Sequence, residues 1–303
     1  MKKIYFLTRK LFQNLMKQQE SCISMKLNKI IFLICFIFTS CFIENLYTNQ
    51  DSTCINTFSN NQISDQNFEV IKSIYIVGHG YGNHYEENLG LSEKIINYFN
   101  SLDKKASVIF TGDLIREPTS ENLDLLKNQL DNLFIEYYIS PGNHELKNEQ
   151  EYYKRFDNEL KLLNFGFLDL FIINTSTNNW QPSRQQQNEI NKLLDESNSQ
   201  FVILFNHQLF WQKMVSDSVE PNGYNLLDTE LHDNYLSWIK IKNKSLTIVS
   251  GDFGRREKSV FCEFVESKDT LFIANGIYDQ TSDQILKLNI YESSYNFEII
   301  DLP

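Results

Sequence analysis

Apolar and polar residues alternate along the chain in a pattern whose period changes several times. Short apolar runs, typical of buried strands, are separated by stretches in which apolar residues recur every three or four positions, as in an amphipathic helix. This alternation predicts an α/β domain with a mainly parallel or mixed sheet and helices on its faces. The expected strands are 74–77, 108–110, 135–139, 168–173, 201–205 and 246–249, and the expected helices are 91–102, 123–133 and 190–194.

The pattern changes after Gly251, where helical spacing no longer occurs. Four apolar runs with short links follow each other there, which is typical of hairpins. These runs predict an antiparallel second sheet at the C-terminal end of the domain. The expected strands are 260–265, 270–274, 285–290 and 297–300.

Composition and charge narrow the function. The 303 residues are 42% hydrophobic, which is enough for one large core or two modest ones. The net charge of -11 is uneven: residues 1–40 carry +6 and the remainder carries -17. Such an acidic body argues against a nucleic-acid substrate, whose phosphates need Lys and Arg neighbours. It tolerates divalent cations, which bring positive charge to a site themselves.

The N-terminal part predicts a targeting segment. A basic stretch from Met25 to Lys29 precedes the apolar run 30–38, which is too short to span a membrane comfortably. The ending Phe38-Thr39-Ser40-Cys41 resembles a bacterial lipoprotein signal, so Cys41 is the predicted lipidation site and Met25 the predicted start. An uncleaved anchor helix is the alternative interpretation.

These features predict three parts of the chain: a targeting segment at 1–41, a polar tether at 42–66 and a folded domain at 67–303. An exported protein can form disulfides. Cys54 and Cys262 are the two cysteines outside the targeting segment, and two residues alone give little weight to a bond between them.

Metal-ligand residues follow four of the predicted strands. They are Asp113, Asn143, His207 and Asp252. Because the carboxyl ends of strands in an open α/β sheet converge on one crevice, these side chains can meet around one ion. Carboxylate and amide oxygens with an imidazole nitrogen suit Mn, Fe, Zn or Mg. A single strand-end aspartate such as Asp113 could instead be a helix N-cap.

Gly112-Asp113, the run Gly142-Asn143-His144-Glu145 and the strand-end His207 resemble the motifs of the calcineurin-like metallophosphoesterases. The resemblance implies a two-sheet β-sandwich flanked by α-helices. It further implies two metal ions that share Asp113, with Asn143 and His207 as ligands of the second ion. His144 would contact the phosphate and protonate the leaving oxygen.

The chain departs from this family pattern at two motifs. The Asp-x-His motif of the family is replaced by a run around His79, and its Gly-His-x-His motif by Gly251-Asp252-Phe253-Gly254. Asp252 can replace the first histidine as a ligand, whereas Gly254 cannot replace the second. The resemblance therefore implies one well-formed metal site, made by Asp113, Asn143, His207 and Asp252, and a depleted site that keeps Asp113 and His79.

Together these observations predict an exported, membrane-anchored metallophosphoesterase of the cell envelope. It would hydrolyse a phosphate monoester or diester by attack of metal-bound hydroxide, with His144 as general acid. We expect one tightly bound divalent ion, and the sequence leaves open whether a second ion binds. The depleted site leaves an alternative, a catalytically weak relative that serves as a binding or scaffold protein.

Overall fold

The structure, a computed structural model, describes residues 69–83, 89–102, 106–157, 160–177, 181–209, 238–239, 241, 243–254, 259–265 and 270–303. These residues all belong to one compact unit, Asp51–Pro303. The predicted targeting segment with Cys41, the tether and Cys54 lie outside the described residues. Within the described part of the chain, no helix has the length and apolar character needed to cross a membrane.

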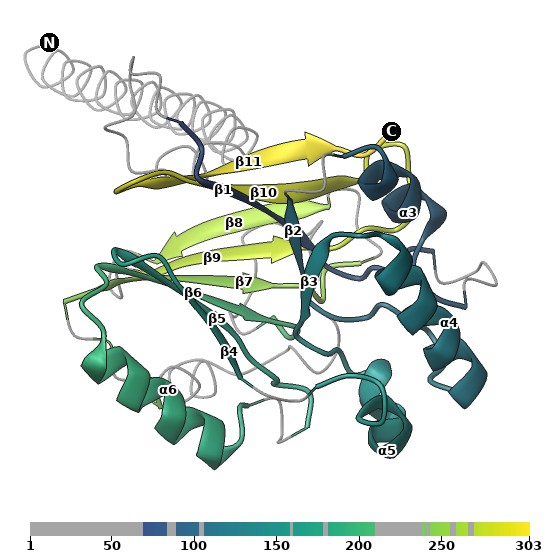
Figure 1. Cartoon of the computed structure of the whole chain (residues 1–303), viewed down its shortest axis with the longest axis horizontal. Helices are drawn as coiled ribbons and strands as arrows, with labels where there is room; N and C mark the ends of the chain where they lie inside the picture. The colour runs from purple at the N-terminus through teal and green to yellow at the C-terminus, as the bar shows by residue number, and fades with distance from the viewer. Residues whose placement is uncertain are drawn as a thin grey trace, which may run out of the picture. The chain divides into compact units, whose positions relative to one another are not determined.

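The first sheet has five strands, contributed by both ends of the described chain. Its central strands β1, β2 and β3 run parallel, while β10 pairs antiparallel with β1 and β11 antiparallel with β10. In spatial order they are β11 (Tyr295–Asp301), β10 (Gln284–Ile290), β1 (Lys72–Val77), β2 (Ser107–Phe110) and β3 (Glu136–Ile139) (Figure 1).

The second sheet has six strands. Here β5, β6, β7 and β9 are parallel to their neighbours, and the outer strands β4 and β8 are antiparallel to theirs. In spatial order they are β4 (Lys161–Asn164), β5 (Leu168–Ile172), β6 (Phe201–Asn206), β7 (Ser245–Ser250), β9 (Thr270–Asn275) and β8 (Val260–Val265).

The two sheets pack face to face because alternate residues of the central strands face opposite sides. On β1, Ile74 and Ile76 join the core between the sheets, whereas Tyr75 and Val77 belong to the core beneath the helices. The same alternation on β6 puts Phe205 between the sheets. Strands that are buried on both faces have continuous apolar sequences, and for this reason they could be predicted from the sequence.

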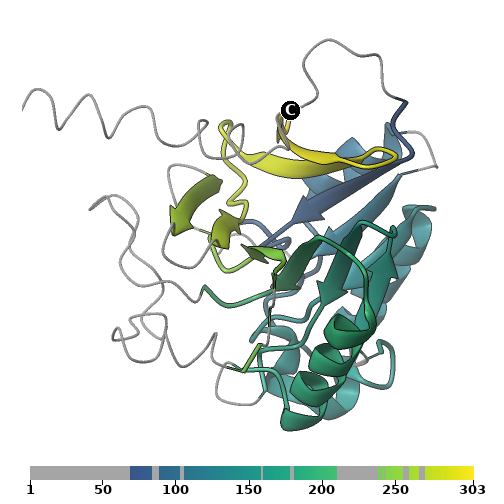
Figure 2. The same cartoon turned by 90° about the vertical axis from the view of Figure 1, so that its left-hand side faces the viewer.

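Helices cover the outer face of each sheet. α3 (Glu93–Asn100) and α4 (Ser120–Asn132) pack on the first sheet, and α6 (Arg184–Glu196) packs on the second (Figures 1 and 2). Each begins at a Ser or Thr whose hydroxyl accepts a backbone N–H of the first turn, which stabilises the helix start. These N-cap residues are Ser92, Thr119 and Ser183.

The structure confirms the α/β class and the two-sheet sandwich, and it adds elements that the sequence pattern did not predict. These are β4, the 3-10 helix η1 (Glu145–Asn148) and the short helix α5 (Glu149–Tyr152). The prediction of a separate antiparallel sheet at the C-terminal end was wrong. β8 and β9 complete the second sheet, whereas β10 and β11 return to pair with β1 in the first.

Cys262 on β8 takes part in a disulfide, a bond for which sequence reasoning had little support. Its side chain is buried in the core between the sheets.

Candidate metal centre

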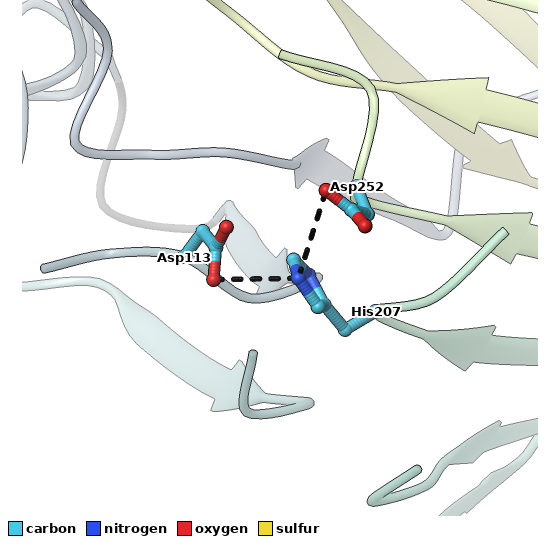
Figure 3. Close-up of side chains that lie close together, drawn as sticks. All are labelled: Asp113, His207 and Asp252. Atoms are coloured by element: carbon cyan, nitrogen blue, oxygen red, sulfur yellow. Dashed lines mark ion pairs between the residues drawn. The ribbon is translucent and has the colours of Figure 1, made fainter. Parts of the chain in front are cut away.

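Three buried side chains that lie far apart in the sequence meet at the carboxyl ends of strands from both sheets. Asp113 follows β2, His207 follows β6 and Asp252 follows β7. Their ligand atoms lie within 4.8 Å of one another, and no residue of the three is more than 2% exposed (Figure 3). Among the described residues, these three form the group of His, Cys, Asp or Glu side chains that could hold a metal ion.

His207 presents its Nε2 atom to the centre of the group. Its Nδ1 lies 2.9 Å from the carbonyl oxygen of Thr111, which can only accept, so Nδ1 carries the proton and Nε2 has the lone pair. The distances from Nε2 are 3.3 Å to Asp113 Oδ1, 3.0 Å to Asn143 Oδ1 and 4.0 Å to Asp252 Oδ1.

These atoms fit a cation. Four acceptors at such distances need either a shared proton or a bound cation between them, and a divalent cation serves all four at once. Ligands about 2.0–2.2 Å from an ion lie roughly 3–3.5 Å from each other, which matches the two shorter separations. The mixed nitrogen and oxygen set suits Mn, Fe, Zn or Mg.

The electrostatics favour a cation as well. Burial raises the pKa of Asp113 to about 7, although a hydrogen bond from the His144 N–H and the charge of Lys147 both lower it. A carboxylate that is costly to ionise when buried becomes stable once a positive charge lies beside it. Metal binding would therefore hold Asp113 ionised at neutral pH.

Gly112 allows the close approach on which this centre depends. Its φ is +91°, and an added Cβ would lie 2.4 Å from His207 Nδ1, so no other residue fits there. The next residue, Asp113, keeps a left-handed backbone with φ of 55° although it carries a side chain. The local chain is thus bent sharply to aim Asp113 at the imidazole.

His144 lies beside the centre, and its side chain is not one of the grouped ligands within the described residues. Its ring Nδ1 lies 2.8 Å from the carbonyl oxygen of Arg116, so Nδ1 donates and Nε2 is the nitrogen available for chemistry. Burial lowers the pKa of His144. A nearby phosphate dianion would act in the opposite sense and favour the charged ring.

His79, the other predicted ligand, is buried near the end of β1, where its Nδ1 lies 3.1 Å from the carbonyl oxygen of Ile277. The structure does not include it in the described ligand group. Its ring fills the space beside Gly254: a Cβ added at Gly254 would lie 2.4 Å from the ring. The two departures from the family motifs are therefore in contact with each other.

Two residues to which the sequence reasoning assigned no role, Tyr81 and Glu145, lie within this region. Tyr81 is buried between the two histidines, with ring centroids 4.3 Å from His79 and 5.3 Å from His144. Burial, reinforced by the charges of Asp113 and Asp252, raises the pKa of Tyr81, so its hydroxyl stays protonated. Glu145 is fully buried behind Asp113. The flanking Gly80 and Gly82 were the available signal for Tyr81.

A polar network fixes the loop that carries Asn143. Ser176 Oγ donates to the carbonyl oxygen of Pro141 at 2.8 Å, and Gln208 Nε2 donates to Ser176 Oγ at 2.7 Å. Gln208 directly follows His207. The loops after β3, β5 and β6 are thereby held to one another, and these bonds fix the position of Asn143 relative to His207, the two side chains that the sequence predicted as ligands.

The fold and the site define the chain as an α/β protein with two sheets, whose strand ends carry a buried group of side chains that could hold a metal ion. The model of the calcineurin-like phosphoesterase family matches residues 79–252, more than half of the chain. The chain belongs to the calcineurin-like phosphoesterase family and is a hydrolase of phosphate esters. No curated protein matches its sequence.

Several solved structures match this chain at low sequence identity. PhoD is 8% identical, with a TM-score of 0.48 over 76% of this chain and 68% of PhoD. TT1561 of Thermus thermophilus is 10% identical, with a TM-score of 0.44 over 78% of this chain and 100% of TT1561. The calcineurin-like phosphoesterase YfkN from Bacillus subtilis is 12% identical, with a TM-score of 0.36 over 77% of this chain and 91% of that one. The family assignment rests on the matched residues 79–252.

Proposed function

We propose that this protein is an exported phosphoesterase that holds one divalent cation tightly and hydrolyses a phosphate monoester or diester. Asp113, Asn143, His207 and Asp252 would hold the ion, which supplies Lewis acidity when bound: it offsets phosphate charge and makes water a better nucleophile. The observation that carries the proposal is the convergence of buried acceptor atoms on His207 Nε2.

The local structure supports one tightly held ion. A second ion that shared Asp113 would need ligands of its own, and the described residues contain one group of three converging His or acidic side chains. Gly254 offers no ligand, and the His79 ring fills the space beside it. His79 remains a predicted ligand of a more weakly held second ion.

His144 is proposed to deliver the proton that the leaving oxygen needs. Its Nδ1 is held by the Arg116 carbonyl, so Nε2 is the atom that would carry the transferred proton. The ring must be cationic to donate from Nε2, and the negative charge of a bound phosphate would favour that state.

Positive side chains near the centre suit an anionic substrate. Lys147 lowers the pKa of Asp113, and Arg116 acts in the same direction on Tyr81, so both cations lie within electrostatic reach of the site. The acidic body of the protein, with a net charge of -17 beyond residue 40, disfavours nucleic acid as the substrate. A small phosphate ester is therefore the proposed substrate class.

Export and membrane anchoring rest on the N-terminal sequence, with lipid attached at Cys41. The disulfide at Cys262 supports an oxidising compartment, because disulfides are rare in the reducing cytosol. The cell envelope is the proposed location.

A second candidate function is favoured by the loss of metal ligands at the two altered family motifs, where the His79 ring now lies against Gly254. In it the same fold binds a metal ion or a phosphate group without efficient turnover, as part of a scaffold in the cell envelope. Metal dependence of hydrolysis separates the two candidates.

The test uses purified protein stripped with a chelator and then supplied with Mn²⁺, Fe²⁺, Zn²⁺ or Mg²⁺ in turn. Hydrolysis of an aryl phosphate monoester and of the matching diester is followed under each condition. We expect turnover to disappear on chelation and to return with at least one of these metals. Protein that binds metal yet leaves both esters intact would favour the scaffold candidate.

A further inference from the structure

One buried carboxylate behind the metal centre gathers an unusual number of backbone donors. Glu145 is fully buried. Its oxygens accept the backbone N–H groups of Asp113 at 3.0 Å, Leu114 at 2.5 Å, Ile115 at 3.1 Å and Gly142 at 2.6 Å. A carboxylate has about four lone-pair sites, so Glu145 is fully engaged by these donors.

The four bonds join the two loops that carry metal ligands. Oε1 accepts from Leu114 and Ile115, which follow Asp113 on the loop after β2. Oε2 accepts from Asp113 itself and from Gly142, which precedes Asn143 on the loop after β3. Each oxygen therefore satisfies two N–H groups, and Oε2 binds both loops at once.

The bonded segment includes the residue whose backbone most needs support. Asp113 has a φ of 55°, in the left-handed region that residues with a Cβ rarely adopt. Such conformations persist where surrounding contacts fix them. The bond from the Asp113 N–H to Glu145, with those from the two residues after it, supplies this fixation.

We infer that Glu145 is the positioning residue of the metal centre: by holding the loops after β2 and β3 together, it sets Asp113 and Asn143 at the separation that one cation requires. The inference rests on the proposed metal site and adds a residue to it that touches neither ion nor substrate. Glu145 acts through the backbone, because both of its oxygens are occupied and it is outside the described ligand group.

The substitution Glu145→Gln tests this with the smallest change in shape. A Gln amide has one acceptor oxygen and one donor NH2, so whichever way it turns, its NH2 faces two N–H groups. Either the Leu114 and Ile115 pair or the Asp113 and Gly142 pair then loses its acceptor. Outer-shell changes typically cost 10–100-fold in metal affinity, and we expect Glu145→Gln to weaken Mn²⁺ binding by about that factor.

Asp169→Asn is the matched control. Asp169 is also fully buried, near the start of β5, and accepts from Ser199 Oγ at 2.6 Å and Asn164 Nδ2 at 2.5 Å. It lies toward the amino end of its strand, away from the carboxyl ends where the metal centre lies. We expect it to lower the thermal stability of the fold and to leave Mn²⁺ affinity unchanged.

Mn²⁺ affinity is measured by calorimetric titration of the full chain, with thermal unfolding recorded alongside. Absence of Mn²⁺ binding by the wild-type protein would overturn the proposed function and this inference with it. Wild-type affinity in Glu145→Gln, or an equal loss in Asp169→Asn, would overturn this inference alone.

If Glu145→Gln does not fold, amide hydrogen exchange of the metal-free wild-type protein decides. We expect slow exchange at the N–H groups of Asp113, Leu114, Ile115 and Gly142, since all four are bonded to a buried acceptor. Exchange at the rate of exposed loop amides would overturn the inference.

Discussion

Replacing Gly254 by Ala tests whether the two departures from the family motifs depend on each other. Gly254 has no left-handed backbone, so alanine is compatible with its conformation. The added Cβ would lie 2.4 Å from the His79 ring, closer than real Cβ contacts allow. The ring must move, although its Nδ1 is bonded to the Ile277 carbonyl and Tyr81 packs beside it.

The expected cost follows from this contact. Extra carbon atoms forced into a packed core typically cost 1–3 kcal/mol, so Gly254→Ala should lower the free energy of unfolding by about 1–3 kcal/mol. With His79→Ala in the background, the space is vacant and most of that cost should vanish. The coupling between the two substitutions should then reach about 1 kcal/mol or more, as residues in contact commonly show.

Urea unfolding of the wild type, both single variants and the double variant measures the coupling. Gly166→Ala provides the control: Gly166 has a φ of +79° and its added Cβ would meet nothing within 4 Å. Its cost should come from the left-handed backbone alone, roughly 1–2 kcal/mol, and should be independent of His79. Additive effects of Gly254→Ala and His79→Ala would refute the contact as the link between the two departures.

Three further predictions concern the chemistry, the acid stability and the localisation of the protein. His144→Ala should reduce turnover of an alkyl phosphate about 10²–10⁴-fold and that of an aryl phosphate less, while the metal stays bound. His207→Ala should lose metal and turnover together. Elemental analysis and rate measurements on both variants check these expectations. Hydrogen bonds from the Tyr138 hydroxyl and from other donors lower the pKa of Glu136, so its stabilisation is present above the unfolded pKa and is lost as the pH falls through the folded value. Because the Glu136 side chain is 54% exposed and water screens these contacts, Glu136→Gln should cost less than about 1 kcal/mol at pH 7 and less still near pH 3, as pH-dependent urea unfolding would show. Cys41→Ala should leave an unprocessed precursor without acyl label, whereas unchanged size and labelling would contradict the lipid anchor.

Much of the fold could be predicted because its strands are buried on both faces and appear as uninterrupted apolar runs. Val108 to Phe110 and Phe201 to Phe205 are such runs, and both lie within strands of the structure. An apolar run does not specify which strand will be its neighbour. The pairing of β10 with β1, for example, depends on which edge of the first sheet is free to accept another strand.

The site could be predicted as far as strand ends allow. Asp113, His207 and Asp252 each directly follow a strand or lie within a few residues of its end, and the structure brings them together. Contacts between side chains on different loops were beyond sequence reasoning. The approach of the His79 ring to Gly254 joins positions that are far apart in the chain. The proposed role of Glu145 likewise depends on another loop, because three of its four backbone donors are Asp113, Leu114 and Ile115.

The central claim is that Asp113, Asn143, His207 and Asp252 enclose one cation, and a crystal structure of the Mn²⁺ complex tests it most directly. Anomalous scattering locates manganese independently of how the side chains are built. The account predicts one strong peak, bounded by a carboxylate oxygen of each aspartate, Asn143 Oδ1 and His207 Nε2. A strong peak elsewhere, or none at this position with Mn²⁺ in excess, would contradict it.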